Sequence, residues 1–298
     1  MIVPSSLKKN DTIAIVSPAK FIEKKLVLQA KGFWEEHGFQ VKLGEHCYDQ
    51  AFYFASTKVN RAKDLQEAID DKEVKAIVCA RGGFGCTHLI DLINWSGFIN
   101  DPKWLIGFSD VTVFHHQLAR LGVASLHGTM PLNYFDNSIA AKQSVVDFLK
   151  GVPLNYSWNP SFSKPGKTVG TLIGGNLAVL SHLIGTSVFC DYSDKILFIE
   201  EVGEHFYTID RMFFQLEKSG ILDQIKGVVF GGLTTIQDTD PPYGETLEAI
   251  LFSYFKYRNI PVAFDFMSGH LADNRALPFG VNAALDITDK RAELSFGR

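Results

Sequence analysis

The sequence predicts an α/β protein with an N-terminal parallel-sheet domain, doubly wound and Rossmann-like, and a C-terminal domain of mixed β/α structure. Short apolar runs alternate with stretches of helical periodicity, which indicates parallel strands joined by helices. A segment rich in turn formers, including Asn155–Gly166, interrupts this pattern. We therefore expect a first domain at residues 1–136, a linker at 137–167 and a second domain at 168–298.

The first domain contains five short apolar or alternating runs that predict strands, at residues 12–17, 39–43, 75–80, 104–108 and 123–126. Helical periodicity follows at residues 21–36 and 59–69, and again after the glycine-rich loop Arg81–Cys86 and after Asp110. In such sheets, ligands bind at the carboxyl ends of the strands. We therefore expect Pro18, the loop at Gly82 and Ser109 to line one crevice.

The second domain shows the same alternation and ends in a hairpin. Strands are predicted at residues 169–173, 195–199, 227–231 and 260–264, and helices at 177–183, 207–218 and 246–255. The glycines of Gly174–Asn176 predict a turn. Residues 284–288 and 291–296 alternate and join at Asp289–Lys290, so they predict a β-hairpin.

Composition narrows the class of protein. The 298 residues are 46% hydrophobic, enough for a large core, and 29 basic and 33 acidic residues give a net charge of -4. These charges are mixed along the chain without a basic block, which argues against nucleic acid as a partner. The sequence shows neither a cationic, apolar leader nor a long apolar span, so we expect a cytoplasmic protein without a membrane partner.

Metal and cofactor motifs are missing from the sequence. The adjacent His115 and His116 would diverge by about 100° around a helix, so we interpret them as a pair on a helix face rather than as ligands of one metal ion. The loop Arg81–Cys86 fits neither the Walker pattern nor G-x-G-x-x-G. We expect no metal and no cofactor. The four cysteines form no C-x-x-C pair and predict buried free thiols: Cys47, Cys79, Cys86 and Cys190.

Ser109 stands where a predicted buried strand passes into a predicted helix. Free backbone N–H groups and the positive end of the helix dipole would lie beside its hydroxyl. Such a corner suits a nucleophile, although a serine before Asp110 is also ordinary helix-capping chemistry. The surrounding residues do not form the G-x-S-x-G elbow, because Val111 stands in place of the second glycine.

Acyl transfer by a serine requires a base, a group that orients the base, and N–H donors for the oxyanion. His270 is the candidate base, with a hydrogen-bonded loop histidine as the alternative. Glu200 or Glu201, at the end of an apolar strand, could orient it, with an ion pair to an arginine as the alternative. The amides of Gly83 and Asp110 could bind the oxyanion.

Several stretches together resemble the serine L,D-carboxypeptidases, a family that includes muramoyltetrapeptide carboxypeptidases and microcin immunity peptidases. Any one of them alone would be weak, but so many in the same order make the resemblance specific. They extend from near the start of the chain to about residue 285. The matching stretches are Ile15–Ala19, Ala80–Gly85, Leu105–Asp110, His127–Met130, Gly174–Leu177, Leu197–Glu200, Ile209–Met212 and Ser268–His270.

The resemblance implies a serine carboxypeptidase with Ser109 as nucleophile, His270 as base and Glu200 as orienting acid, with Glu201 in reserve. It also implies oxyanion donors at the amides of Asp110 and Gly83, a first domain with the serine and a second with the other two residues. The expected substrate is a murein tetrapeptide, cut between an L-centre such as diaminopimelate and a terminal D-alanine. A homodimer is also implied.

Substrate specificity is less defined by the resemblance. Arg81 is a candidate for the terminal carboxylate of the substrate, because an arginine binds carboxylates well. Phe84, a further substrate-binding candidate, stands where the family often has tyrosine, so contacts to substrate could differ. Two alternatives remain open: an immunity-type amidase acting on an aminoacyl-nucleotide toxin, and a non-catalytic protein that binds a small molecule between two domains.

Overall fold

The computed structural model describes residues 1–297, and the chain divides into two compact units. Unit 1 contains Met1–Val152 and Ala272–Gly280. Unit 2 contains Pro153–Leu271 and the residues from Val281 onward. The chain therefore leaves unit 1 after Val152 and returns to it for nine residues, Ala272–Gly280, near its end.

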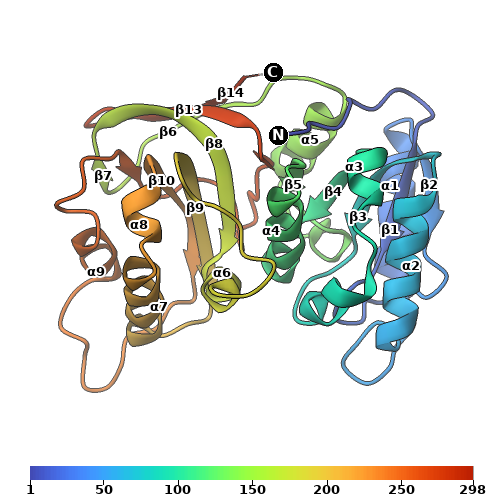
Figure 1. The fold of residues 1–298 in the computed structure, drawn as a ribbon, viewed down its shortest axis with the longest axis horizontal. Coiled ribbons are helices and arrows are strands. Elements are labelled where there is room, and N and C mark those ends of the chain that lie inside the picture. Colours follow the sequence, from blue (N-terminus) through green and yellow to red (C-terminus); the bar gives the residue numbers. More distant parts are fainter. Residues whose placement is uncertain (298) are drawn as a thin grey trace. The chain divides into compact units, whose positions relative to one another are not determined.

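Unit 1 is built on a six-stranded sheet in the order β12-β5-β4-β3-β1-β2 (Figure 1). The first five strands along the chain are parallel, as predicted, and β12 pairs antiparallel with β5 at the edge. Their bounds are β1 (Thr12–Val16), β2 (Gln40–Leu43), β3 (Val74–Cys79), β4 (Trp104–Gly107), β5 (Ser125–His127) and β12 (Leu277–Phe279).

The helices of unit 1 connect these strands. They are α1 (Lys24–Glu36), α2 (Lys58–Asp70), α3 (Gly97–Asn100), α4 (Thr112–Arg120) and α5 (Ile139–Leu149), with 3₁₀ turns η1 (Cys86–Leu92), η2 (Ser109–Val111) and η3 (Pro131–Asn133). The chain passes from β1 outward to β2 and then back to β3 on the other side of β1. Right-handed crossovers in opposite directions place α1 and α2 on opposite faces, so the sheet is doubly wound.

Burial explains why these segments fold locally as they do. Every residue of β1 and β4 is buried, as expected for strands covered on both faces. In α1 the buried positions Val27, Ala30 and Trp34 recur at helical spacing. The hydroxyl of Thr57 caps α2 by accepting the N–H of Asn60 at 3.2 Å.

Unit 2 is built on an eight-stranded mixed sheet in the order β6-β14-β13-β8-β9-β10-β11-β7. Four neighbouring strands, β8 to β11, are parallel, and the remaining four pair antiparallel. The predicted hairpin at the end of the chain is confirmed as β13 and β14. The strands are β6 (Asn155–Trp158), β7 (Ser163–Lys164), β8 (Gly166–Asn176), β9 (Lys195–Val202), β10 (Gly227–Thr234), β11 (Val262–Ala263), β13 (Asn282–Ile287) and β14 (Ala292–Phe296).

The helices of unit 2 follow the parallel strands. The helix predicted at residues 177–183 is confirmed as α6. The helices predicted at 207–218 and 246–255 are α7 and α9, with ends that differ by one or two residues, and the short helix α8 was not predicted. Their bounds are α6 (Leu177–Leu183), α7 (Phe206–Lys218), α8 (Ile221–Gln224) and α9 (Leu247–Ser253).

The turn predicted at Gly174–Asn176 is wrong, because these residues complete β8. Gly174 pairs with Phe198 and Asn176 with Glu200 across the parallel ladder to β9. A Cβ on Gly174 would lie 1.8 Å from the carbonyl oxygen of Phe198. The glycine therefore permits close approach of two backbones rather than a change of direction.

The segment expected as a linker, residues 137–167, contains α5, β6 and β7. The hydroxyl of Ser138 caps α5 by accepting the N–H of Ala141 at 2.9 Å, and it donates to Asp273 at 2.6 Å. The backbone N–H of Ser138 donates to the carbonyl of Ala272. These contacts join α5 to the C-terminal segment of unit 1, and the change of unit falls between Val152 and Pro153.

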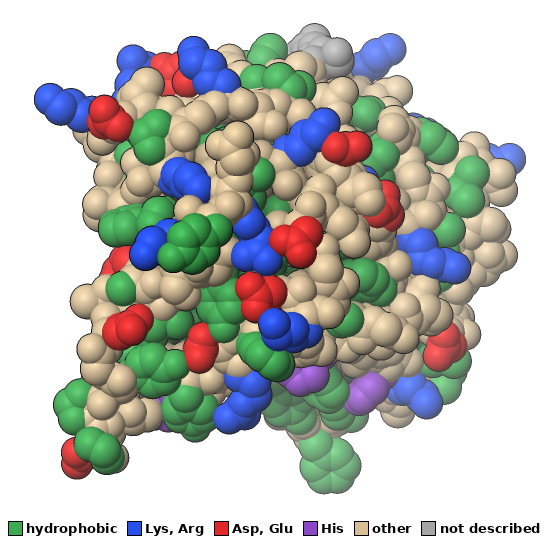
Figure 2. Space-filling view, turned by 60° about the vertical axis from the view of Figure 1, so that its left-hand side comes forward, with side chains coloured by type: hydrophobic (Ala, Val, Ile, Leu, Met, Phe, Trp, Pro, Cys, Tyr) green, Lys and Arg blue, Asp and Glu red, His purple; other side chains and the backbone are tan. Residues whose placement is uncertain are grey.

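The cysteines, the surface charges and the helix lengths bear on the expectations drawn from composition. All four cysteines are free and buried, as predicted. Acidic and basic side chains are interspersed on the face drawn in Figure 2. Among the helices within residues 1–297, none combines the length and the apolar character that crossing a bilayer demands.

Candidate active site

Ser109 occupies a sharp strand-to-helix corner at the end of β4, as predicted. Phe108 is extended, Ser109 has a φ of 63°, and the 3₁₀ turn η2 passes directly into α4. The left-handed conformation costs a residue other than glycine roughly 1–2 kcal/mol. Strain of this kind is commonly retained where a side chain must be presented for function.

The glycine loop after β3 packs against this corner. A Cβ on Gly82 would lie 3.3 Å from both the Ser109 Cβ and the Asp110 amide nitrogen, so the two loops are in van der Waals contact. Gly83 follows with a φ of 104°, and within unit 1 its N–H donates to no other group. Asp110 lies in the first turn of η2, where N–H groups lack intrahelical acceptors. The structure thus brings the loop that carries Gly83 against the corner that carries Ser109 and Asp110, so the predicted nucleophile lies near both predicted oxyanion donors.

The side chain of Asp110 fixes the geometry of these loops. It is buried, and its carboxylate accepts the backbone N–H of Cys86 at 2.9 Å. Burial raises the pKa of this carboxyl group, while the Cys86 hydrogen bonds and the nearby Arg61 partly oppose the shift. Arg61 in turn donates to the carbonyls of Pro18 and Gly85. One buried polar network therefore joins the loops that follow β1, β3 and β4.

Arg81 and Phe84, the candidate substrate-binding residues, lie on the same loop. Arg81 is half-buried, and its Nη1 donates to the carbonyl of Phe21 at 3.0 Å. Burial lowers the pKa of its guanidinium below the usual value. Phe84 is exposed and packs against His88, with 5.0 Å between ring centroids. Within the glycine loop, Arg81 is therefore held by the backbone after β1, whereas Phe84 is exposed.

Two residues that the sequence reasoning did not single out, Lys20 and Tyr53, lie against Gly83. A Cβ on Gly83 would be 3.1 Å from the Lys20 Cβ and 3.2 Å from the Tyr53 hydroxyl. The available signal was the position of Lys20, four residues after the end of β1 and next to Pro18–Ala19. Tyr53 gave no such signal, because its loop is brought to this place only by folding.

Glu200 and His270 form a hydrogen-bonded pair in unit 2. Nδ1 of His270 lies 2.6 Å from Oε2 of Glu200, whose side chain is fully buried in β9. Gly269 has a φ of 111°, and a Cβ there would lie 2.7 Å from the Glu200 Cβ. The glycine therefore lets the His270 segment pass directly over the carboxylate.

Electrostatics at this pair favour a charged imidazole. Burial lowers the pKa of His270, but the hydrogen bond and the negative charge of Glu200 outweigh burial, and Glu201 adds a smaller effect in the same direction. The net result is a pKa above the usual histidine value. When Nδ1–H donates to Glu200, the nitrogen that can act as a proton acceptor in the neutral ring is Nε2.

Glu201 has different partners from Glu200, because successive side chains in a strand point to opposite faces. Its carboxylate accepts from the Asn176 side chain at 2.9 Å, from the Ala178 N–H at 2.6 Å and from its neighbour Val202 at 2.8 Å. Burial raises the pKa of this carboxyl group. Glu201 therefore binds the N-terminus of α6, and the hydrogen bond to His270 is made by Glu200.

The histidine pair in α4 is buried in unit 1. Nε2 of His115 lies 2.9 Å from the Gly107 carbonyl, and Nδ1 lies 2.8 Å from the Ser125 hydroxyl. Nδ1 of His116 lies 2.8 Å from the Thr112 carbonyl. Both ring nitrogens of His115 are thus occupied by the protein. Within residues 1–297, no group of three or more histidine, cysteine or acidic side chains has a geometry suited to a metal ion.

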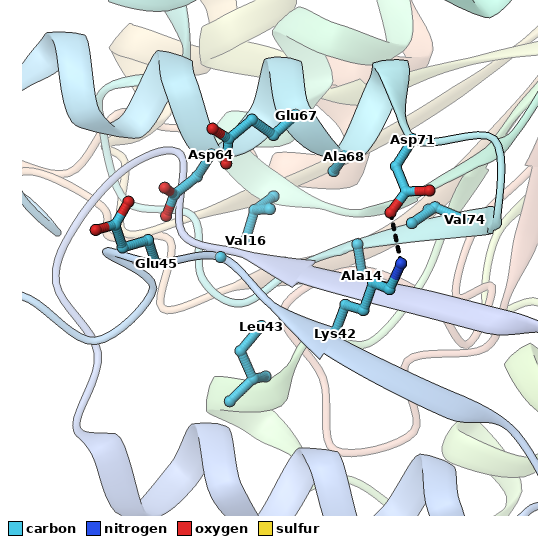
Figure 3. Close-up of a pocket in the computed structure, with 11 residues that line it drawn as sticks. Ala14, Val16, Lys42, Leu43, Glu45, Asp64, Glu67, Ala68, Asp71 and Val74 are labelled. Carbon is cyan, nitrogen blue, oxygen red and sulfur yellow. Dashed lines mark hydrogen bonds and ion pairs between the residues drawn. The ribbon is translucent and has the colours of Figure 1, made fainter.

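A separate cavity of about 240 Å³ lies between α2 and the strands β1 and β2 (Figure 3). It contains none of the predicted site residues. Its acidic side chains already have cationic or histidine partners: Asp71 with Lys42, Asp64 with His46, and Glu45 and Glu67 with Lys63. We therefore assign the chemistry to the loops at the strand ends rather than to this cavity.

Comparisons with known proteins match both halves of the chain. Residues 13–128 match the model of the LD-carboxypeptidase N-terminal domain, and residues 169–285 match that of the LD-carboxypeptidase C-terminal domain. These two ranges contain every residue assigned above to the candidate site.

Full-length relatives agree with these matches. A probable murein peptide carboxypeptidase of Bacillus subtilis is 33% identical, over 99% of this chain and 94% of its own length. The murein tetrapeptide carboxypeptidase of Pseudomonas aeruginosa is 30% identical, over 92% of each chain. The crystal structure of muramoyltetrapeptide carboxypeptidase from Oxalobacter formigenes superposes with a TM-score of 0.89 at 29% identity, over 96% of this chain and 99% of that one.

Proposed function

Because the chain belongs to the LD-carboxypeptidase family, we propose that it is a serine carboxypeptidase that releases a terminal D-amino acid from a murein peptide. The observation that carries the proposal is the 2.6 Å hydrogen bond between Glu200 and His270. It gives the imidazole a fixed orientation and a defined tautomer, as a general base requires.

In the proposed reaction, Nε2 of His270 accepts the hydroxyl proton of Ser109 while Oγ attacks the carbonyl carbon of the terminal peptide bond. Glu200 accepts Nδ1–H throughout and stabilises the imidazolium that forms. The tetrahedral oxyanion is bound by the amides of Asp110 and Gly83. His270 then donates its proton to the leaving amine, and water, deprotonated by the same imidazole, hydrolyses the acyl-enzyme.

The corner at Ser109 supports the role of nucleophile over that of a helix cap. A capping serine stands at the N-cap position and accepts a backbone N–H with its side-chain oxygen. Here the N-cap residues of η2 and α4 are Phe108 and Val111, so Ser109 occupies neither capping position. Its positive φ also adds strain that capping alone would not require.

The proposed substrate is a peptide with a free terminal carboxylate, cut between an L-centre such as diaminopimelate and D-alanine. This substrate class follows from the relatives that are named murein peptide and murein tetrapeptide carboxypeptidases. Arg81 is proposed to contribute positive charge near the terminal D-amino acid, which is the leaving group of the reaction. We further propose that the enzyme acts in the cytoplasm. We also propose that it is a homodimer, and size-exclusion chromatography with light scattering would test this oligomeric state.

Fluorophosphonate labelling and D-alanine release test the proposal together. The wild type should be labelled at Ser109 and should release D-alanine from a murein tetrapeptide, and Ser109→Ala and His270→Ala should do neither. Turnover of an aminoacyl sulfamoyl nucleotide with no D-alanine release would support the amidase alternative. Saturable peptide binding without labelling or turnover would support a binding protein and overturn the proposal.

A further inference from the structure

We propose that the ammonium group of Lys20, held over the ring of Tyr53, binds the terminal carboxylate of the peptide substrate. This inference rests on the proposed carboxypeptidase activity and assigns a specificity residue to it. A carboxypeptidase must distinguish a free carboxylate from a continuing chain, and a cation beside the scissile carbonyl supplies that distinction.

The position of Lys20 follows from the topology of unit 1. The chain leaves β1 toward β2 on one side and reaches β3 on the other, so the strand order reverses between β1 and β3. Ligands of doubly wound sheets bind outside the carboxyl ends of the strands at this reversal. Lys20 follows β1 and Gly83 follows β3, so both residues stand at this place.

Backbone contacts fix Lys20 beside the proposed oxyanion donor. Its N–H donates to the carbonyl of Gly82 at 3.4 Å, and it forms an antiparallel bridge with Phe54. The side chain begins against Gly83, since a Cβ there would be 3.1 Å from that of Lys20. The stem of the lysine is therefore held next to the amide that would bind the scissile carbonyl.

The charge of Lys20 is oriented but not neutralised within unit 1. Its Nζ lies 4.8 Å from the centroid of the Tyr53 ring, and it forms no ion pair in that unit. The Tyr53 hydroxyl points at Gly83, 3.2 Å from where a Cβ would stand, and can donate a second hydrogen bond to a carboxylate. A cation over an aromatic ring beside a hydroxyl donor is suited to a carboxylate ligand.

Arg81 differs from Lys20 in having part of its guanidinium committed to the protein. Nη1 of Arg81 donates to the carbonyl of Phe21, and the N–H of Phe21 donates to the carbonyl of Tyr53. Arg81 thereby braces the two segments that carry Lys20 and Tyr53. We assign the direct contact to Lys20 and the bracing to Arg81.

The experiment compares two tetrapeptides that differ only at the C-terminus, one a free acid and one a primary amide. The wild type should prefer the free acid. Lys20→Met should lower kcat/KM for the free acid by roughly 10- to 100-fold, the usual effect of losing one charge-assisted hydrogen bond, and should change the amide little. Lys20→Arg should restore most of the preference, because it returns the charge.

Lys24→Met is the matched control, because Lys24 makes a similar contact with Tyr48, at 4.7 Å, on the exposed start of α1. It should leave the preference for the free acid unchanged. If the wild type cleaves the free acid preferentially and Lys20→Met keeps that preference, the inference is wrong while the proposed function stands. If the wild type cleaves neither peptide, the proposed function is wrong and the inference falls with it.

Discussion

The imidazole of His270 and the carboxylate of Glu200 are joined by a 2.6 Å hydrogen bond, although 70 positions separate them in the sequence. The carboxylate is fully buried while the imidazole remains partly exposed. Such a pair holds one ring nitrogen inside the protein and leaves the other for proton transfer.

Glu200→Gln should move the acidic limb of the pH profile of kcat/KM to lower pH. The base must be neutral to accept a proton, so activity falls below the pKa of His270. Because the Glu200 hydrogen bond and charge raise this pKa against burial, removing the charge should lower it. The rate at the optimum should also fall, on the order of 10²- to 10⁴-fold. The profile is measured on D-alanine release between pH 5 and 9.

Glu201→Gln is the control for that experiment. Its carboxylate binds the start of α6, so the change should lower stability and leave the acidic limb nearly in place. A limb that shifts equally in both variants would show that Glu200 has no special coupling to His270.

Ser109→Gly should be more stable than Ser109→Ala by roughly 0.5–1 kcal/mol in the free energy of unfolding, and both should be inactive. Glycine adopts the left-handed φ of 63° without strain, and its greater freedom in the unfolded chain offsets only part of that gain. Urea unfolding of the two variants measures the difference. Equal stabilities would mean that the corner stores no backbone strain.

Gly174→Ala should destabilise the protein by more than about 3 kcal/mol, since the new methyl group would overlap the Phe198 carbonyl and the φ is 149°. Gly32→Ala is the control. Gly32 lies in α1 with nothing within 4 Å of the added carbon, and alanine there should stabilise by roughly 0.5–1 kcal/mol. Thermal and urea unfolding give both values, and a mild effect at Gly174 would contradict the strand pairing described for β8.

His115→Gln should reduce the acid sensitivity of folding. Burial lowers the pKa of His115 to about 4. Between about pH 6.5 and pH 4 this histidine is therefore protonated in the unfolded chain but neutral in the folded chain. Stability contributed by the neutral ring is therefore present above pH 6.5 and is lost as the pH falls toward 4. Between pH 7.5 and 4.5 the wild type should lose roughly 2 kcal/mol more than the variant. Urea unfolding at each pH measures the free energy of unfolding of both proteins. Equal losses of stability in the wild type and in His115→Gln would contradict a buried neutral ring.

The sequence by itself determined the alternation of strands and helices, the parallel sheet of unit 1 and the corner at Ser109, because hydrophobic periodicity and helix-start signals are local. The local pattern gave a wrong prediction at Gly174–Asn176. The glycines there predicted a turn, but these residues belong to β8 and allow its backbone to lie close to that of β9.

Only the tertiary structure decided which glutamate binds His270 and which residues surround Gly83. Alternation along β9 predicts that Glu200 and Glu201 face opposite ways, but which face meets the His270 loop and which meets α6 depends on long-range packing. Lys20, Tyr53 and Gly83 likewise come from three separate loops that converge at the strand ends. Their meeting is fixed by strand order, which no local pattern encodes.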